Sequence, residues 1–356
     1  MKFSSDLLAF PPQRGTASQQ GIWRVGGGQP LLVVVPWVSL LALLAGWLLA
    51  PAALERLMYL PLLVSTVLFG IPHGALDHLV PGRLGWAWSR RPGRVWLYVL
   101  GYALLAAATL RLWSLVPDVV FWGFLLVSLL HWGQGDLHYL ETVQGRRRSG
   151  PWSAPLTLLA RGSLPILLPL LVFPEWYARL AAGVHQVFGL PTVTGPLLTG
   201  TQTGVLTAGL ALLLLAYAAD TLVSSPGALL ELGETALLLA VFVVVPAPLS
   251  IGLYFSLWHA WRHLGRLLLL PVGPDASPSP GQKTGTARVL RLVLDLLPIT
   301  LVALGLLAAL YFWAAPRVQN TETFAALYLA LIAALTLPHA LLVALMDLPA
   351  SKPAGA

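Results

Sequence analysis

Long apolar runs alternate with short polar connections along most of this chain. A helix needs about 20 apolar residues to cross the hydrocarbon of a bilayer, and several of these runs reach that length. The pattern therefore predicts an all-α, polytopic transmembrane bundle with about ten spans. The predicted spans lie near residues 31–50, 57–80, 95–115, 119–140, 153–174, 203–223, 228–246, 247–270, 291–314 and 323–347.

Four segments fall outside these spans. Glycines and prolines interrupt residues 177–200, which we interpret as a re-entrant or interfacial piece, or as part of a further span. Residues 1–30 lack a short apolar core with a cleavage site, so a cytoplasmic tail is expected there and not a signal peptide. A Pro/Ser/Gly-rich cytoplasmic loop, 271–287, interrupts the transmembrane domain 31–347, and a second tail follows at 348–356.

Composition and charge place the chain in a membrane. It is 57% hydrophobic and 10% charged, whereas soluble domains carry about 25% charged residues. The net charge of +7 reflects basic residues concentrated in alternate connections, so we expect no nucleic-acid partner. By the positive-inside rule both termini are cytoplasmic and the protein lies in the cell membrane. The expected inside residues are Lys2, Arg14, Arg24, Arg83, Arg90, Arg91, Arg94, Arg146, Arg147, Arg148, Lys283 and Arg288, whereas outside loops carry about one basic residue each, such as Arg56, Arg111, Arg179 and Arg317.

Histidines inside the apolar runs are the chemical feature of the sequence, because ionisable groups are expensive within a bilayer and mark functional sites. Five of them occur on even-numbered predicted spans at similar distances from the start of each span. At a rise of about 1.5 Å per residue they occupy one slab near the midplane. They are His73, His131, His259, His263 and His339.

Helix periodicity then selects among these side chains. His259 and His263 are four residues apart, hence on one helix face where both reach one ion. His73 and His78 point in different directions, so one of them is expected to face the ion. His131 and His138 share a face but lie about 10.5 Å apart along the axis, too far for one metal. The chain has no cysteine, so nitrogen or oxygen must hold any metal.

The sequence thus predicts a metal held by His73, His131, His259 and His263. Asp77 and Asp136 are either ligands themselves or carboxylates that orient a ligand imidazole. Taken singly, His185 and His339 are expected to be packing residues. The residues expected either to contact the metal ligands or to line a pocket are Asp77, His78, Asp136, His138, Trp258 and His339.

Two further features are open to two interpretations each, and a third predicts ion pairs. Tyr254, Phe255, Trp258 and Trp261 either line a pocket for a flat apolar substrate or pack against neighbouring helices. Pro72 and Pro338 precede histidines, and the kinks they introduce either line a site or are architectural. Glu231 and Glu234 are expected to pair with Arg262 or Arg266.

The motifs PHGALDH at 72–78, HWGQGD at 131–136 and WHAWRH at 258–263 resemble the Brp/Blh-like membrane β-carotene dioxygenases of bacteria and archaea. The resemblance runs from the second to the tenth predicted span. It implies that His73, His131, His259 and His263 bind Fe²⁺, and that the protein cleaves the central double bond of β-carotene with O₂. The two retinal molecules would then supply a rhodopsin.

Two other functions fit part of the pattern. A histidine-rich iron hydroxylase or desaturase of lipids or carotenoids would carry more clustered histidines, and only the 259/263 pair matches its motifs. A proton or metal transporter would also place histidine and aspartate at mid-depth, as in His73 and Asp77. No glycine-rich nucleotide fingerprint supports a hydride-transfer enzyme.

Overall fold

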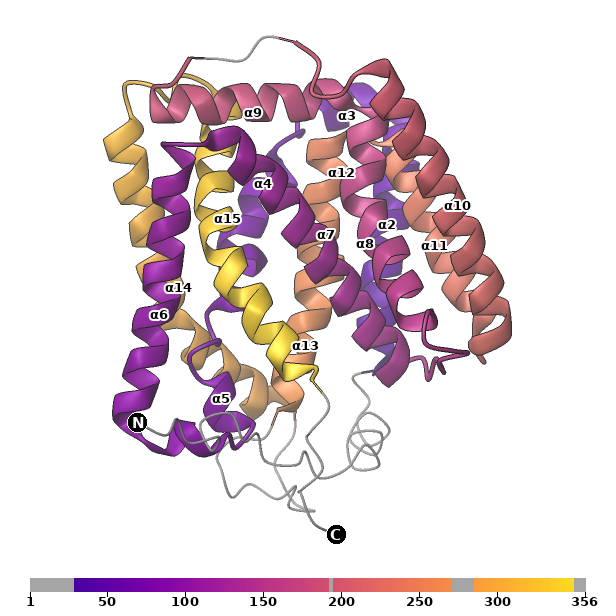
Figure 1. The fold of residues 1–356 in the computed structure, drawn as a ribbon, viewed down its shortest axis with the longest axis horizontal. Coiled ribbons are helices and arrows are strands. Elements are labelled where there is room, and N and C mark those ends of the chain that lie inside the picture. Colours follow the sequence, from indigo (N-terminus) through magenta and orange to yellow (C-terminus); the bar gives the residue numbers. More distant parts are fainter. Residues whose placement is uncertain (1–28, 192–194, 271–284, 349–356) are drawn as a thin grey trace, which may run out of the picture.

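The computed structural model describes residues 29–191, 195–270 and 285–348, and within these residues it contains helices and no strand. The long helices run side by side as one bundle (Figure 1). This confirms the all-α class. The elements are α2 (Gln29–Leu49), α3 (Pro51–Glu55), α4 (Leu60–Ser65), η2 (Thr66–Gly70), η3 (Pro72–Gly74), α5 (Val80–Arg83), η4 (Ala87–Arg90), α6 (Pro92–Trp113), α7 (Pro117–Thr142), α8 (Ser153–Val172), α9 (Pro174–Phe188), α10 (Gly200–Ser224), α11 (Ala228–Val244), α12 (Ala247–Tyr254), η5 (Phe255–Ala260), α13 (Trp261–Leu269), α14 (Gly285–Ala314) and α15 (Thr321–Met346).

Six helices of the described chain are long and apolar enough to cross a membrane, namely α2, α6, α8, α10, α14 and α15. The other four predicted spans differ from this ideal. The second is broken between α4 and η3, and the eighth is divided among α12, η5 and α13. Helix α11 has 17 residues, and α7 is long at 26 residues but carries several polar side chains. The count of ten therefore stays a prediction.

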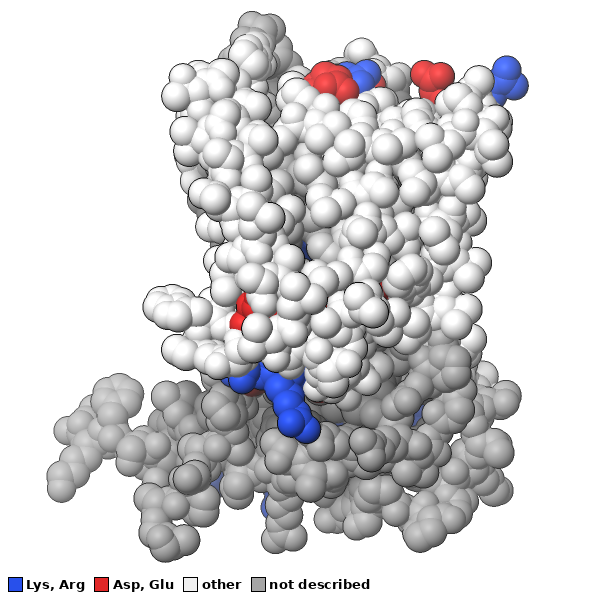
Figure 2. Space-filling view, turned by 90° about the vertical axis from the view of Figure 1, so that its right-hand side faces the viewer, with Lys and Arg blue, Asp and Glu red and all other residues white. Residues whose placement is uncertain are grey.

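The six spans divide into a lipid-facing shell and a central pair. In α2, α6, α10 and α14 only 11–22% of the most apolar window is buried, against 61% in α8 and 50% in α15. Figure 2 shows one face of the surface, with charged side chains gathered near its two ends and a broad band between them that is almost free of charged residues. Such a band is what a bilayer would cover.

Helix α9 covers the first half of the interrupted segment 177–200 and runs across the top of the bundle in Figure 1, roughly perpendicular to the long helices. It packs mainly on α15. Its apolar and polar residues fall on opposite faces, which is typical of a helix lying at an interface. The interfacial interpretation of this segment therefore agrees with the structure.

Figure 1 places α9, which carries Arg179, and α5, which carries Arg83, at opposite ends of the bundle. This matches the opposite sides predicted from charge, and which end is cytoplasmic stays a prediction. The predicted tails 1–30 and 348–356 and the loop 271–287 lie almost entirely outside the described residues.

Helices α7 and α8 make the closest crossing of the core, and two glycines permit it. A Cβ added to Gly133 would lie 2.0 Å from the carbonyl oxygen of Leu158, and one added to Gly162 would lie 2.0 Å from that of Leu129. Non-bonded carbon and oxygen atoms do not approach each other so closely, so glycine is required at both positions for this backbone contact.

Gly133→Ala is expected to destabilise the protein by about 1–3 kcal/mol or more, because the added methyl group forces α7 and α8 apart. Gly123→Ala on the same helix is the matched control, since a Cβ there meets nothing within 4 Å. Thermal unfolding of both purified variants in detergent measures the difference. Equal unfolding temperatures for the two variants would contradict the close crossing.

Candidate metal centre and its pocket

Five histidine rings from four parts of the chain meet at mid-depth in the bundle. His73 lies in η3, His131 in α7, His259 in η5, His263 in α13 and His339 in α15. Neighbouring ring centroids are 4.8–6.5 Å apart, and every one of these residues is at most 8% exposed. The structure thus brings together the four predicted ligands and adds a fifth imidazole.

Irregular helix geometry places two of these side chains. His73 follows the π-helical turn η2 and lies in the short 3₁₀ segment η3, and His259 lies within the π-helical turn η5. π-Helical turns occur often at functional sites. Gly70 ends η2, and a Cβ there would lie 2.8 Å from the ring of Phe255, so this glycine lets the segments around His73 and His259 approach each other.

Hydrogen bonds leave the histidine nitrogens suited to a cation. Nδ1 of His73 lies 2.5 Å from the carbonyl oxygen of Gly70, so it carries the proton and leaves Nε2 as a lone pair. Both ring nitrogens of His131, and Nε2 of His259, His263 and His339, are buried without a hydrogen-bond partner. Buried polar atoms are normally satisfied, so such a group of unpaired nitrogens calls for an ion.

The nitrogens of three of these histidines are also spaced closely enough for one metal, whereas His259 and His263 lie outside this closest group. One ligand nitrogen from each of His73, His131 and His339 lies within 4.8 Å of the other two. Imidazole nitrogens bind at about 2.0–2.1 Å, so two of them on one ion are up to about 4.2 Å apart. The residues present therefore fit a metal with small side-chain adjustments, and a nitrogen-only ligand set suits a first-row transition metal.

The remaining predicted histidines lie elsewhere. Nδ1 of His78 bonds to the carbonyl oxygen of Ala75 at 3.0 Å, and Nδ1 of His138 lies 3.5 Å from Asp347. His185 is bonded to Asp118 and to the carbonyl oxygen of Pro191, away from the cluster. As the helix geometry predicted, one histidine of each pair lies in the cluster: His73 and not His78, and His131 and not His138.

The two candidate orienting carboxylates differ in what they contact. Oδ2 of Asp77 accepts a hydrogen bond of 2.8 Å from Nδ1 of His339. Asp136 binds Arg161 at 2.8 Å and Arg262 at 3.3 Å, and it accepts a hydrogen bond from the indole of Trp258 at 2.9 Å. Asp136 and Trp258 therefore belong to a buried ionic network, and the orienting role expected of Asp136 and the pocket role expected of Trp258 stay predictions.

That network is a part of the site that the sequence analysis missed. Arg161 and Glu234 are fully buried, and Arg161 binds both Glu234 and Asp136. Arg262 joins the same two carboxylates, so two positive and two negative groups balance. The expected pairing of Glu234 with Arg262 is confirmed, whereas Glu231 binds Arg146 and Tyr217 instead.

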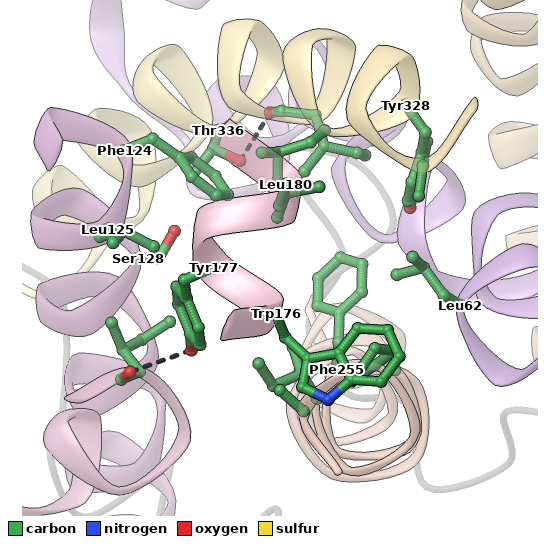
Figure 3. A pocket seen from close by; sticks show the side chains of 18 of the residues that line it. Leu62, Phe124, Leu125, Ser128, Trp176, Tyr177, Leu180, Phe255, Tyr328 and Thr336 are labelled. Atoms are coloured by element: carbon green, nitrogen blue, oxygen red, sulfur yellow. Dashed lines mark hydrogen bonds between the residues drawn. The ribbon is translucent and has the colours of Figure 1, made fainter. Parts of the chain in front are cut away.

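Above the histidines, an apolar pocket of about 1130 Å³, including its mouth, reaches toward α9. Figure 3 shows labelled lining side chains from several helices, among them Phe124, Tyr177, Trp176, Phe255 and Tyr328. Of the four aromatic residues considered for a pocket, only Phe255 lines it. The others pack elsewhere: Tyr254 stacks on Trp258, and Trp261 bonds to the backbone.

Two hydroxyl groups of the pocket wall donate to backbone carbonyls. Tyr177 donates its hydroxyl to Ile166 at 3.0 Å and Thr336 to Ile332 at 2.7 Å, as the dashed lines in Figure 3 show. The lining residues thus present mainly carbon to the cavity. At its outer end the wall includes Arg179 and Glu322, an exposed ion pair 3.5 Å long. Such a pocket suits a long hydrocarbon.

A smaller and more polar cavity lies on the other side of the cluster. His131, His259 and His263 line it together with His138 and Arg266. The apolar pocket, in contrast, is lined by His73, His131 and His339. The histidine cluster is therefore the wall between two cavities of different polarity.

Comparison with known proteins identifies the scaffold that carries this site. The family model described as "Beta-carotene 15,15'-dioxygenase" matches residues 64–347. The chain belongs to this family. The match contains all five clustered histidines and begins within the second predicted span, as the motif resemblance predicts.

Two curated relatives from the family come from Halobacterium salinarum. The "Probable beta-carotene 15,15'-dioxygenase Blh" is 36% identical over 87% of this chain and 90% of its own length. The "Probable beta-carotene 15,15'-dioxygenase Brp" is 25% identical over 66% of this chain and 67% of its own. No solved structure matches the chain.

Proposed function

We propose that this protein cleaves the central double bond of β-carotene with O₂ and releases two molecules of retinal. The observation that carries the proposal is that the apolar pocket ends at the histidine cluster. His73, His131 and His339 line the floor of the apolar pocket, so a hydrocarbon within it would lie against the histidine cluster. Family membership and the names of the relatives support the same activity.

We infer that the metal is Fe²⁺ and that His73, His131, His259 and His263 hold it. Neutral imidazoles leave the ion its full charge and suit iron among several metals. When bound, ferrous iron supplies the redox chemistry by which O₂ reacts with a carbon–carbon double bond. Both oxygen atoms end in the two aldehydes, so the balanced reaction needs no external reductant.

The protein side chains bind the substrate, orient it and exclude water. Trp132 and Phe255 stack with their ring centroids 5.8 Å apart, and Phe255 stacks in turn on His259 at 6.2 Å. These flat rings form a wall beside the histidines on which a planar polyene can lie. The pocket wall presents mainly carbon, which gives water few partners beside the imidazoles.

Location in the membrane fits this substrate. β-Carotene dissolves in the hydrocarbon of a bilayer, so a pocket between spans can receive it without transfer through water. We propose that the protein lies in the cell membrane with both termini in the cytoplasm, and that its retinal supplies a rhodopsin.

Removal of oxygen is expected to stop the reaction, because O₂ is a substrate. Membranes that contain the protein should leave β-carotene intact under anaerobic conditions and form retinal after air is admitted. A strong ferrous chelator should block the reaction in air, and added Fe²⁺ should restore it. Chromatography of the extracted carotenoids and retinal provides the measurement.

The same experiment separates the alternative functions. A hydroxylase would yield an intact, oxygenated carotenoid and would require a reductant, and a transporter would leave β-carotene unchanged in air. Retinal formed in the absence of O₂ would overturn the proposed reaction.

A further inference from the structure

We propose that His339 is a ligand of the metal and that Asp77 and Tyr102 hold it in position. This inference rests on the proposed metal centre and changes its ligand set, since the motif resemblance implies four other histidines. It starts from the place of His339 in the cluster. Its ring centroid lies 4.8 Å from that of His73, 4.9 Å from His131 and 5.1 Å from His263.

The hydrogen bond to Asp77 defines which nitrogen of His339 is available. A carboxylate accepts hydrogen bonds, so Nδ1 of His339, at 2.8 Å from Oδ2 of Asp77, carries the proton. In the neutral imidazole, Nε2 then carries an unprotonated lone pair. His339 is only 3% exposed, and Nε2 is buried without a hydrogen-bond partner.

A purely structural role for His339 leaves that lone pair unexplained. A buried acceptor without a donor costs about 1–3 kcal/mol, and water or a hydroxyl group normally removes that cost. Here the His339 nitrogen instead lies within 4.8 Å of ligand nitrogens from His73 and His131. Three acceptors facing one another repel, and a cation between them turns this repulsion into binding.

Asp77 is itself held by α6. Tyr102 donates its hydroxyl to Oδ2 of Asp77 at 2.9 Å, and Tyr98 donates to the backbone carbonyl of Asp77 at 3.1 Å. These bonds fix a carboxylate that lies in the turn between η3 and α5. Metal-bound histidines usually donate their second nitrogen to such a carboxylate, which orients the ring and makes it a stronger ligand.

Asp77 also brings negative charge to the centre. Asp136 contacts two arginines, so its charge is already balanced, whereas Asp77 contacts a histidine of the cluster directly. A carboxylate one imidazole away from the ion would offset part of its charge in a medium of low dielectric constant. The chain from Tyr102 through Asp77 to His339 thus links α6 and α15 to the metal.

Metal binding tests this ligand. The purified, metal-free protein is titrated with Co²⁺, whose visible absorption depends on the number and arrangement of its ligands. His339→Ala is expected to lower Co²⁺ affinity at least about 100-fold and to change the spectrum, more than the 10–100-fold loss typical of an orienting residue. Asp77→Asn is expected to lower affinity about 10–100-fold. His185→Ala removes a buried histidine that is bonded to Asp118 and is the control with unchanged affinity.

His339→Asn distinguishes a ligand from a packing residue. Its amide can still donate to Asp77, but it lacks Nε2, so affinity should fall as in the alanine variant. Wild-type affinity and spectrum in either His339 variant, beside a loss in His131→Ala, would overturn the role of His339 and leave the metal centre standing. Failure of the wild type to bind Co²⁺ or Fe²⁺ would overturn the metal centre itself.

Discussion

Replacement of His131 by alanine is expected to abolish retinal formation and to lower iron content more than about 100-fold, because it removes a ligand and not an orienting group. His131 is central to both parts of the site, since it lines the apolar pocket and the polar cavity alike. Its ring lies 4.8 Å from His259 and 4.9 Å from His339. His73→Ala, His259→Ala and His263→Ala are expected to have the same effect.

Retinal yield and iron per purified chain are the two measurements, and they should fall together. His138→Ala is the matched control on the same helix, because His138 lies two turns from His131 beside Asp347. It should retain its iron. Full iron and activity in His259→Ala or His263→Ala would remove the basis for a metal site that includes this pair.

Arg161→Met is expected to lower the free energy of unfolding by about 3–5 kcal/mol. The substitution keeps a side chain of similar length but leaves Asp136 and Glu234 as buried charges with one arginine between them. It also removes the hydrogen bond to Thr235. The loss should appear as poor recovery of folded protein and as a large decrease in unfolding temperature in detergent.

Arg148→Met provides the comparison for this ionic network. Arg148 also forms an ion pair, with Glu141 at 2.6 Å, but its side chain is 60% exposed. Exposed pairs contribute at most about 1 kcal/mol, so this variant should unfold almost as the wild type does. Similar unfolding temperatures for the two arginine variants would show that the buried network contributes little to stability.

Much of the bundle and of the histidine cluster could be predicted because both depend on periodicity and length. Apolar runs of about 20 residues marked the regular spans, and similar positions within the runs placed His73, His131, His259 and His263 at one level. Regular α-helical geometry also predicted that His131 and His138 would not both reach one metal, and only His131 lies in the cluster. These inferences need only the rise and rotation of a helix.

The rest depends on contacts between segments that are distant in sequence. The sequence placed His339 in the same slab as the other histidines, but as a single histidine in its run it favoured packing, and its contacts with His73 and His131 come from the packing of α15 against η3 and α7. The contacts of Asp136 depend on Arg161, which lies within the apolar segment LLARGSL. The ion-pair partners of Arg161 lie on α7 and α11. An arginine within a span is itself a signal of a buried partner, and this signal could have been used.

The π-helical turn η5 has a consequence for how relatives of this protein are compared. A π-helical turn contains one residue more than an α-helical turn, and one residue corresponds to about 100° of helix rotation. Deletion of one residue between Phe255 and Trp258 would therefore change the direction of His259 and His263 relative to α12, whereas deletion of Ala260 would turn His263 away from the face that His259 occupies. Hydropathy and overall similarity would barely change. A one-residue gap in this segment of an alignment is thus a sharper sign of lost activity than low overall identity.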